Sequence, residues 1–239
     1  SSMQIATIES GAREFNLIKR DAQNQVCNNV MHLLTRHSTN ANQDVTQEKL
    51  VEKVLRLNAD VISVAEMRNE EAYAAQEASL VGTPIISTAH AGSPRQAHKR
   101  VADLCRKRFP VDPQTALIQA CEAFPLVAFI HMLPDHRRRI MNLSECLVKD
   151  NTPIYRTLYE YEIDSNTFQN GKSVIKGHHK KVNTVSNELC AHMKMYGITE
   201  DEIQTLLKRD TKTITKKEVV KEALKFIYNE SEGENDRDD

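Results

Sequence analysis

Short apolar runs that alternate with helical patterns over residues 4–133 limit the possible folds most strongly. Four uninterrupted runs have the length of strands: Gln4–Glu9, Val61–Ala65, Pro84–Ala89 and Leu126–Leu133. Continuous apolar runs of this length are typical of strands that are buried on both faces, as in a parallel sheet. The sequence therefore predicts an α/β protein whose core is a parallel sheet that includes all four runs.

Helix signals lie between these runs. The segment Val45–Leu57 repeats apolar residues at helical spacing. Ser93-Pro94 and Asp112-Pro113 each place a capping side chain before a proline, which is favoured at the first position of a helix. Strands that alternate with helices in this way indicate βα units.

The pattern changes after about residue 134. Arg137–Val148 and Ile154–Ile163 alternate polar and apolar residues like half-exposed strands, and Asn170-Gly171 is a hairpin turn signal before Lys172–Lys176. Three helices are predicted next, from a cap at Ser186 with a stop at Gly197 and from the capping pairs Thr199 with Glu202 and Thr215 with Glu218. We thus expect a core domain over 4–150, a β-hairpin and helical extension over 151–229, and an acidic disordered tail over 230–239.

Charge and cysteine usage exclude several classes of protein. The chain has 32 basic and 33 acidic residues, and the final ten carry six acids and one arginine, so the remainder has a net charge of about +4 (−1 minus −5). This weak charge does not indicate a nucleic-acid binder. No apolar stretch approaches the roughly 20 residues of a membrane-spanning helix. The five cysteines never form a CxxC pair, so we expect buried thiols rather than a zinc site or disulfides, and a reducing compartment.

Ionisable residues follow three of the predicted strands. Glu9 and Glu14 follow the first strand, Glu66 and Arg68 the second, and His90 the third. Ligands of open α/β sheets bind at the carboxyl ends of the strands. A carboxylate there can hold the water shell of Mg²⁺ and polarise an attacking water, and a histidine can contact a phosphate. Each residue alone is more often an ordinary surface group, but the three segments together indicate a nucleotide-hydrolysing site.

These segments resemble the motifs of the secretion ATPases of type II and type IV secretion and of type IV and Tad pilus assembly. The similarity is greatest to the type IV secretion and Tad branch and strongest over residues 4–108. It rests on four boxes in the expected order: Ile8-Glu9 with Glu14 for the acidic box, Leu55-Arg56 with Asp60 for an LRxxPD stretch, Glu66 and Arg68 for Walker B, and Thr88, His90 and Ala91 for the histidine box.

The resemblance implies a RecA-like ATPase that uses ATP and Mg²⁺, works as a homo-oligomeric ring (a hexamer) and docks on an inner-membrane secretion or pilus platform protein from the cytoplasmic side. It assigns catalytic roles to Glu66, Glu9, Glu14 and His90, with Glu66 contacting Mg²⁺ through water. It assigns nucleotide contacts to Arg68, Arg13, Arg20 and Arg56. For Arg13 and Arg20, which could act across a subunit boundary, an ordinary surface position is the simpler alternative. No direct nucleic-acid binding is expected, although the clusters Arg106-Lys107-Arg108 and Arg137-Arg138-Arg139 leave it as a distant alternative.

The sequence also departs from the family pattern. Ser10 replaces an acid of the acidic box, and Ala65 replaces the Walker B glycine. No G-x-x-x-x-G-K-[ST] loop occurs, and Gly171-Lys172-Ser173 shares only its last letters. We therefore expect a C-terminal part of a longer motor that is inactive by itself. The alternative is a non-catalytic interaction module with a decayed nucleotide site.

Overall fold

A computed structural model describes residues 3–207, except for the side chain of residue 41. Its elements are two sets of strands and six α-helices: β1 (Gln4–Glu9), β2 (Asn29–Leu34), η1 (Ala41–Gln43), α1 (Gln47–Arg56), β3 (Val61–Val64), α2 (Glu71–Leu80), β4 (Ile85–Ser87), α3 (Pro94–Arg108), α4 (Pro113–Ala123), β5 (Leu126–Met132), β6 (Arg138–Lys149), β7 (Thr152–Gln169), β8 (Lys172–Lys181), α5 (Asn187–Met195) and α6 (Glu200–Leu207). These residues form two compact units, 3–125 with 146–155 and 126–145 with 156–207. No helix within 3–207 is both long and apolar enough to span a bilayer.

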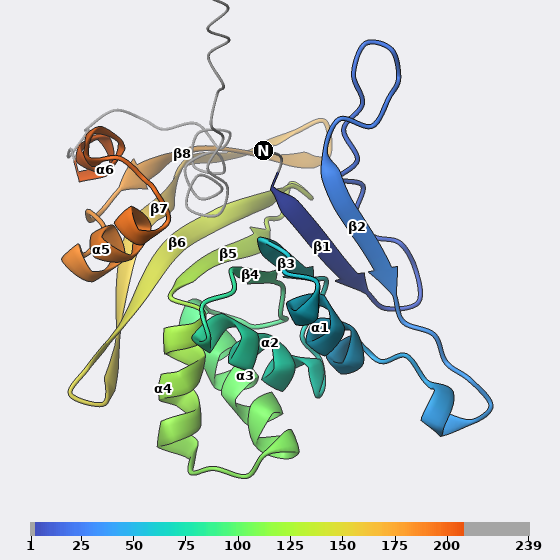
Figure 1. Ribbon diagram of the computed structural model, residues 1–239. Coiled ribbons are helices and arrows are strands. Elements are labelled where there is room, and N and C mark those ends of the chain that lie inside the picture. The colour runs from blue at the N-terminus through green and yellow to red at the C-terminus, as the bar shows by residue number, and fades with distance from the viewer. Residues whose placement is uncertain (1–2, 208–239) are drawn as a thin grey trace, which may run out of the picture. The chain divides into compact units, whose positions relative to one another are not determined.

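The first unit is built on a parallel sheet of order β2-β1-β3-β4 (Figure 1). The expected parallel α/β core is thereby confirmed, and β1, β3 and β4 correspond to three of the predicted runs. The central strands bury Ile8, Ile62 and Val64 completely, as their apolar sequences predict. The strand β2 escaped prediction because it is only half-buried and contains His32, so it lacks an apolar run.

Helices α1 and α2 pack against this sheet, and α3 and α4 pack against α2. The Thr46 hydroxyl caps α1 by accepting a hydrogen bond from the Lys49 amide, and Ser93 and Asp112 cap α3 and α4 at the predicted positions. The helix α2 carries no apolar stripe. Its alanines, Ala72, Ala74, Ala75 and Ala78, are buried around the helix, which is why periodicity did not reveal it.

The second unit contains an antiparallel sheet of order β5-β6-β7-β8. The prediction that Leu126–Leu133 belongs to the parallel sheet is wrong, because β5 pairs antiparallel with β6. This strand is only partly buried, and Ile130 and Met132 are exposed. An uninterrupted apolar run therefore did not indicate burial on both faces here.

The remaining features of the second unit follow local sequence rules. Asn170 and Gly171 both adopt the left-handed conformation, as a tight hairpin turn requires, with φ of 50° and 76°. Ser186 caps α5, and the Thr199–Glu202 capping box begins α6 as predicted. The buried residues Leu143, Leu158, Leu189 and Ile203 form its core. The predicted helix at Thr215–Glu218 and the acidic tail lie outside the described residues.

Candidate functional site

Glu66, Arg68 and His90 meet where β3 and β4 end. An Arg68 Nη2 atom pairs with Oε2 of Glu66, and Nε2 of His90 lies 3.3 Å from the other oxygen, Oε1. Glu66 is mostly buried, with 18% of its side chain exposed, whereas Arg68 and His90 are 64% and 83% exposed. The structure thus brings together the acidic and histidine residues that the two strand ends were predicted to supply. We call these three residues the Glu66 cluster.

Backbone hydrogen bonds beyond the strands fix this cluster. The Ala65 amide donates to the Ile8 carbonyl at 2.9 Å, and the Met67 amide donates to the Thr88 carbonyl at 2.8 Å. The Thr88 hydroxyl in turn donates to the Ala65 carbonyl at 2.6 Å. The chain on both sides of Glu66 is therefore bound to its two neighbouring segments, which sets the direction of its side chain.

The Glu66 carboxylate is held in its ionised form. The hydrogen bond from Arg68 lowers the pKa of Glu66, burial opposes this effect, and the charges of Arg68, His90 and Arg100 add to the lowering. Its buried Oε1 atom has no hydrogen-bond partner among the described residues. His90 Nε2 lies 3.3 Å from this atom without a hydrogen bond between them, so Oε1 can still accept a hydrogen bond from a bound water.

Glu9 is buried and its oxygens are already engaged. Oε2 accepts hydrogen bonds from the backbone amides of Glu14 and Phe15, and Oε1 accepts one from the Thr7 hydroxyl at 2.8 Å. Burial raises the pKa of Glu9, but these donors outweigh burial, so the net pKa lies below the ordinary value. His32 of β2 also lies 3.3 Å from Oε1, a contact that sequence reasoning missed because β2 was not predicted. Glu9 thus anchors the segment that follows β1.

The other predicted site residues make their contacts outside the Glu66 cluster, apart from Glu14. The charge of Glu14 contributes to the raised pKa of Arg68, after the larger effects of the hydrogen bond and charge of Glu66. Arg20 donates a hydrogen bond to the Asn24 carbonyl within its own loop, and Arg56 is the last residue of α1. Within residues 3–207, no hydrogen bond or ion pair joins Arg13, Arg20 or Arg56 to Glu66.

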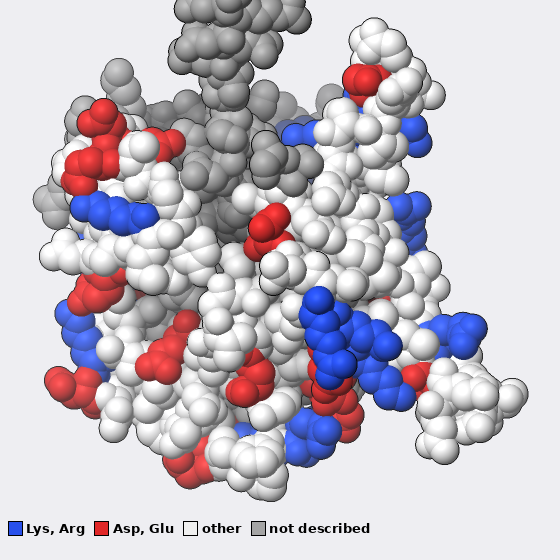
Figure 2. Space-filling view, in the orientation of Figure 1, with Lys and Arg blue, Asp and Glu red and all other residues white. Residues whose placement is uncertain are grey.

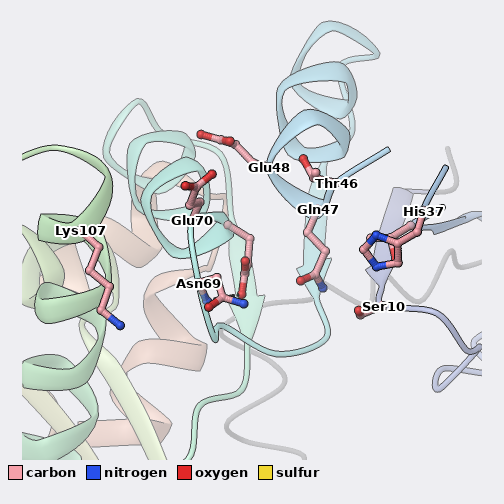
Figure 3. A pocket seen from close by; sticks show the side chains of 10 residues that line it. Ser10, His37, Thr46, Gln47, Glu48, Asn69, Glu70 and Lys107 are labelled. Carbon is pink, nitrogen blue, oxygen red and sulfur yellow. Dashed lines mark hydrogen bonds between the residues drawn. The ribbon is translucent and has the colours of Figure 1, made fainter. Parts of the chain in front are cut away.

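A hollow of about 500 Å³ in the first unit is lined by none of the three cluster residues (Figure 3). Ser10 lines it at the end of β1, together with the carboxylates of Glu48, Glu70 and Glu71 and the ammonium group of Lys107. Three carboxylates against one ammonium group repel phosphates. This lining does not favour a phosphate, so we place the candidate chemistry at the Glu66 cluster.

The adjacent histidines of β8 and the basic cluster at the end of α3 also have partners in the structure. His178 lies 3.0 Å from Asp164, whereas His179 is buried against the Ile140 carbonyl, so these two adjacent histidines of β8 do not share a site. Arg108 donates to Glu48 at 2.9 Å. In Figure 2 several basic side chains adjoin one another over α1, with acidic side chains next to them.

Four of the five cysteines are buried, as expected, but Cys27 is exposed. No disulfide joins the five, all of which lie within the described part of the chain.

The comparison with solved structures found several ATPases. The VirB11 ATPase of the Brucella suis type IV secretion system, in complex with sulphate, is 22% identical over 60% of this chain and 40% of its own, with a TM-score of 0.47. The DotB ATPases of Legionella pneumophila and Yersinia pseudotuberculosis are 14% and 10% identical over 85% of this chain, with TM-scores of 0.41 and 0.40. The chain spans about two fifths of the length of these structures, at 40%, 42% and 41%.

The family comparison is more decisive. None of the functionally curated proteins matches the sequence. The family model described as "Type II/IV secretion system protein" matches residues 1–233. Because this match spans nearly the whole sequence, the chain belongs to the type II/IV secretion system protein family.

Proposed function

We propose that this chain supplies the Walker B and histidine-box part of an ATP-hydrolysing site in a motor for secretion or pilus assembly. One observation carries the proposal. The ionised carboxylate of Glu66 stands at the carboxyl ends of two parallel strands, between Arg68 and His90, and its buried Oε1 atom forms no hydrogen bond within the described residues.

The two oxygens of Glu66 have different surroundings, and we assign them different roles. Oε2 is held by Arg68, which fixes the plane of the carboxylate. Oε1 remains available to accept a proton-bearing water and to orient it towards a phosphate. Mg²⁺ bound together with ATP would neutralise charge on the transferred phosphoryl group, and Glu66 would contact the ion through water. His90 is largely exposed beside Oε1 and is placed to donate a hydrogen bond to a terminal phosphate oxygen.

We also assign roles to the residues that follow β1 and to Arg56. Glu9 anchors the segment that bears Glu14, and the carboxylate of Glu14 helps to balance the charge of Arg68. Arg13 and Arg20 are exposed, so they are available to reach nucleotide bound by a neighbouring subunit. Arg56 lies at the end of α1, where we assign it a nucleotide contact within the assembled ring. The working form is a hexameric ring on the cytoplasmic face of the inner membrane, docked on a platform protein.

A non-catalytic interaction module is the second candidate. Ser10 lines the acidic hollow instead of adding a carboxylate to the cluster, and Ala65 places a buried methyl group directly before Glu66. Both departures from the family pattern are consistent with a nucleotide site that has lost its catalytic role. The two candidates differ in what Glu66 does, so its replacement separates them.

The test measures ATP turnover and ATP binding in the protein that its own gene encodes, including any residues before Met3. Glu66→Gln keeps the size of the side chain but removes the charge that orients water, so we expect kcat to fall by about 10²-fold or more with ATP affinity within a few-fold of wild type. Glu77→Gln, an exposed acid on α2, is the matched control and should retain turnover. A Glu66→Gln protein that hydrolyses ATP at the wild-type rate would refute the assignment. A wild-type protein that binds its partners but hydrolyses no ATP would favour the interaction module.

A further inference from the structure

Three potential metal ligands that are distant in the sequence meet inside the first unit. His98 comes from α3, Cys121 from α4 and Cys146 from the end of β6. One ligand atom from each residue lies within 4.8 Å of the other two. The residues are 2%, 0% and 4% exposed, so the cluster is closed to bulk solvent. The structure thus assembles two thiols and an imidazole in a buried site, separate from the Glu66 cluster.

The orientation of His98 suits a metal ligand. Its Nε2 atom lies 2.8 Å from the Phe124 carbonyl oxygen, which can only accept a hydrogen bond. Nε2 therefore carries the ring proton in the neutral imidazole, and Nδ1 presents its lone pair to the cluster. A ring N–H that donates to a backbone carbonyl is the arrangement that commonly fixes the tautomer of metal-bound histidines.

Tyr155 of β7 supplies an oxygen at the same place. Its hydroxyl lies 3.0 Å from Nδ1 of His98 and 3.7 Å from Sγ of Cys121. In a tetrahedral zinc site with Zn–S bonds of about 2.3 Å and Zn–N bonds of about 2.0 Å, ligand atoms are separated by about 3.3–3.8 Å. The two distances from the phenol oxygen are near these separations, so this oxygen can serve as the fourth ligand. The other three ligand atoms lie within 4.8 Å of one another and need to approach by up to about 1.0–1.5 Å.

We propose that His98, Cys121 and Cys146 bind one zinc ion, with the Tyr155 hydroxyl at the fourth corner. Two sulfur atoms and one imidazole nitrogen form a ligand set that zinc favours over the oxygen-seeking ions Mg²⁺ and Ca²⁺. Binding converts both thiols to thiolates and releases their two protons to the solvent. Because the ligands come from α3, α4 and the 146–155 segment, the ion would hold that segment against the two helices.

Cobalt binding provides a direct test, because Co²⁺ replaces zinc in tetrahedral thiolate sites and is coloured there. The full 239-residue chain is stripped with a chelator, kept reduced and titrated with Co²⁺. We expect one cobalt per chain, a thiolate-to-cobalt charge-transfer band with intense d–d bands, and displacement of the cobalt by one equivalent of Zn²⁺. A folded and reduced wild-type chain that takes up less than about a tenth of an equivalent would overturn the proposal.

Variants locate the ion. Cys121→Ser and Cys146→Ser should each lower cobalt affinity by about 100-fold or more, whereas Cys105→Ser, a buried thiol of α3 that donates to Gln76, should bind as wild type does. Tyr155→Phe should keep the charge-transfer band but change the d–d bands, because it removes only the oxygen. Circular dichroism checks the folding of each variant. If folded Cys105→Ser and folded Cys121→Ser lose the same cobalt affinity, the assignment of the ligands is overturned.

Discussion

Replacing Glu9 with alanine should free the segment that follows β1, and the size of the effect follows from the hydrogen bonds that are lost. The carboxylate accepts two backbone hydrogen bonds, from Glu14 and Phe15. Hydrogen bonds to a charged group contribute about 1.5–3 kcal/mol each, which gives an upper range of about 3–6 kcal/mol. Glu14 is exposed and Phe15 is partly exposed, so water can replace the lost acceptor, and we expect a cost near 3 kcal/mol.

Hydrogen exchange of these two amides is the assay. A cost of about 3 kcal/mol in local opening corresponds to a loss of protection of about two orders of magnitude. Glu9→Gln keeps an acceptor oxygen for both amides, and its NH₂ group can donate to Thr7 or His32. Amide protection in this variant should therefore fall only about tenfold, or roughly 1.4 kcal/mol. The Gln4 amide, which donates to Asp60, is an internal control that should not change. If Glu9→Ala leaves both amides protected within twofold, the anchoring role of Glu9 is wrong.

The anchoring of this segment by Glu9 should depend on pH. The net pKa of folded Glu9 is below the ordinary glutamate value of about 4.3, so its contribution to stability is complete above that value. The contribution is lost as the pH falls through the lowered pKa. Amide protection at Glu14 should therefore hold at neutral pH and decrease only in acid, whereas a decrease that begins above pH 6 would contradict this assignment.

Three further predictions concern stability and share equilibrium unfolding as their measurement. Ser93→Ala removes the oxygen that accepts from the Gln96 amide at the start of α3, and should cost about 1 kcal/mol in urea unfolding; an unchanged midpoint would exclude a role for this cap. Leu158→Ala opens a cavity at a side chain that is 1% exposed, and should cost about 2–5 kcal/mol, whereas a loss below 0.5 kcal/mol would mean that the core of the second unit repacks freely. The hydrogen bonds from Arg139 lower the pKa of Asp135 to about 2, so this pair stabilises the second unit at neutral pH and weakens as the pH falls from about 3.9 towards 2. The stability of Asp135→Asn should not show this loss between about pH 3.9 and 2. Identical acid-unfolding profiles of the variant and the wild type would refute the prediction.

Local sequence rules predicted much of the fold. The capping residues Ser93, Asp112 and Ser186 begin helices as expected, because each side chain satisfies amides of the first helical turn. The errors have physical causes as well. The run Leu126–Leu133 is apolar but lies in an antiparallel sheet with one side largely exposed, and strand partners depend on the whole chain rather than on the run itself.

The candidate site was predictable in part. The chain order placed Glu66 and His90 after successive strands, and parallel pairing of β3 with β4 brings their ends together. The engagement of Glu9 by amides five and six residues later depends on the path of a loop, which no pattern specifies. The meeting of Cys121 and Cys146 was equally hidden, because their separation in sequence matches no short metal-binding motif.

The most direct test of the central claim is the turnover number of Glu66→Asp in the protein as its gene encodes it. This variant keeps the negative charge but withdraws the carboxylate by one methylene group, so it tests position rather than charge. We predict that kcat falls by about 10²-fold while ATP affinity stays within a few-fold of wild type, because misplacement by about 1 Å is enough to disturb the attacking water. Wild-type turnover in Glu66→Asp would contradict the assignment of Glu66 as the residue that orients water for hydrolysis.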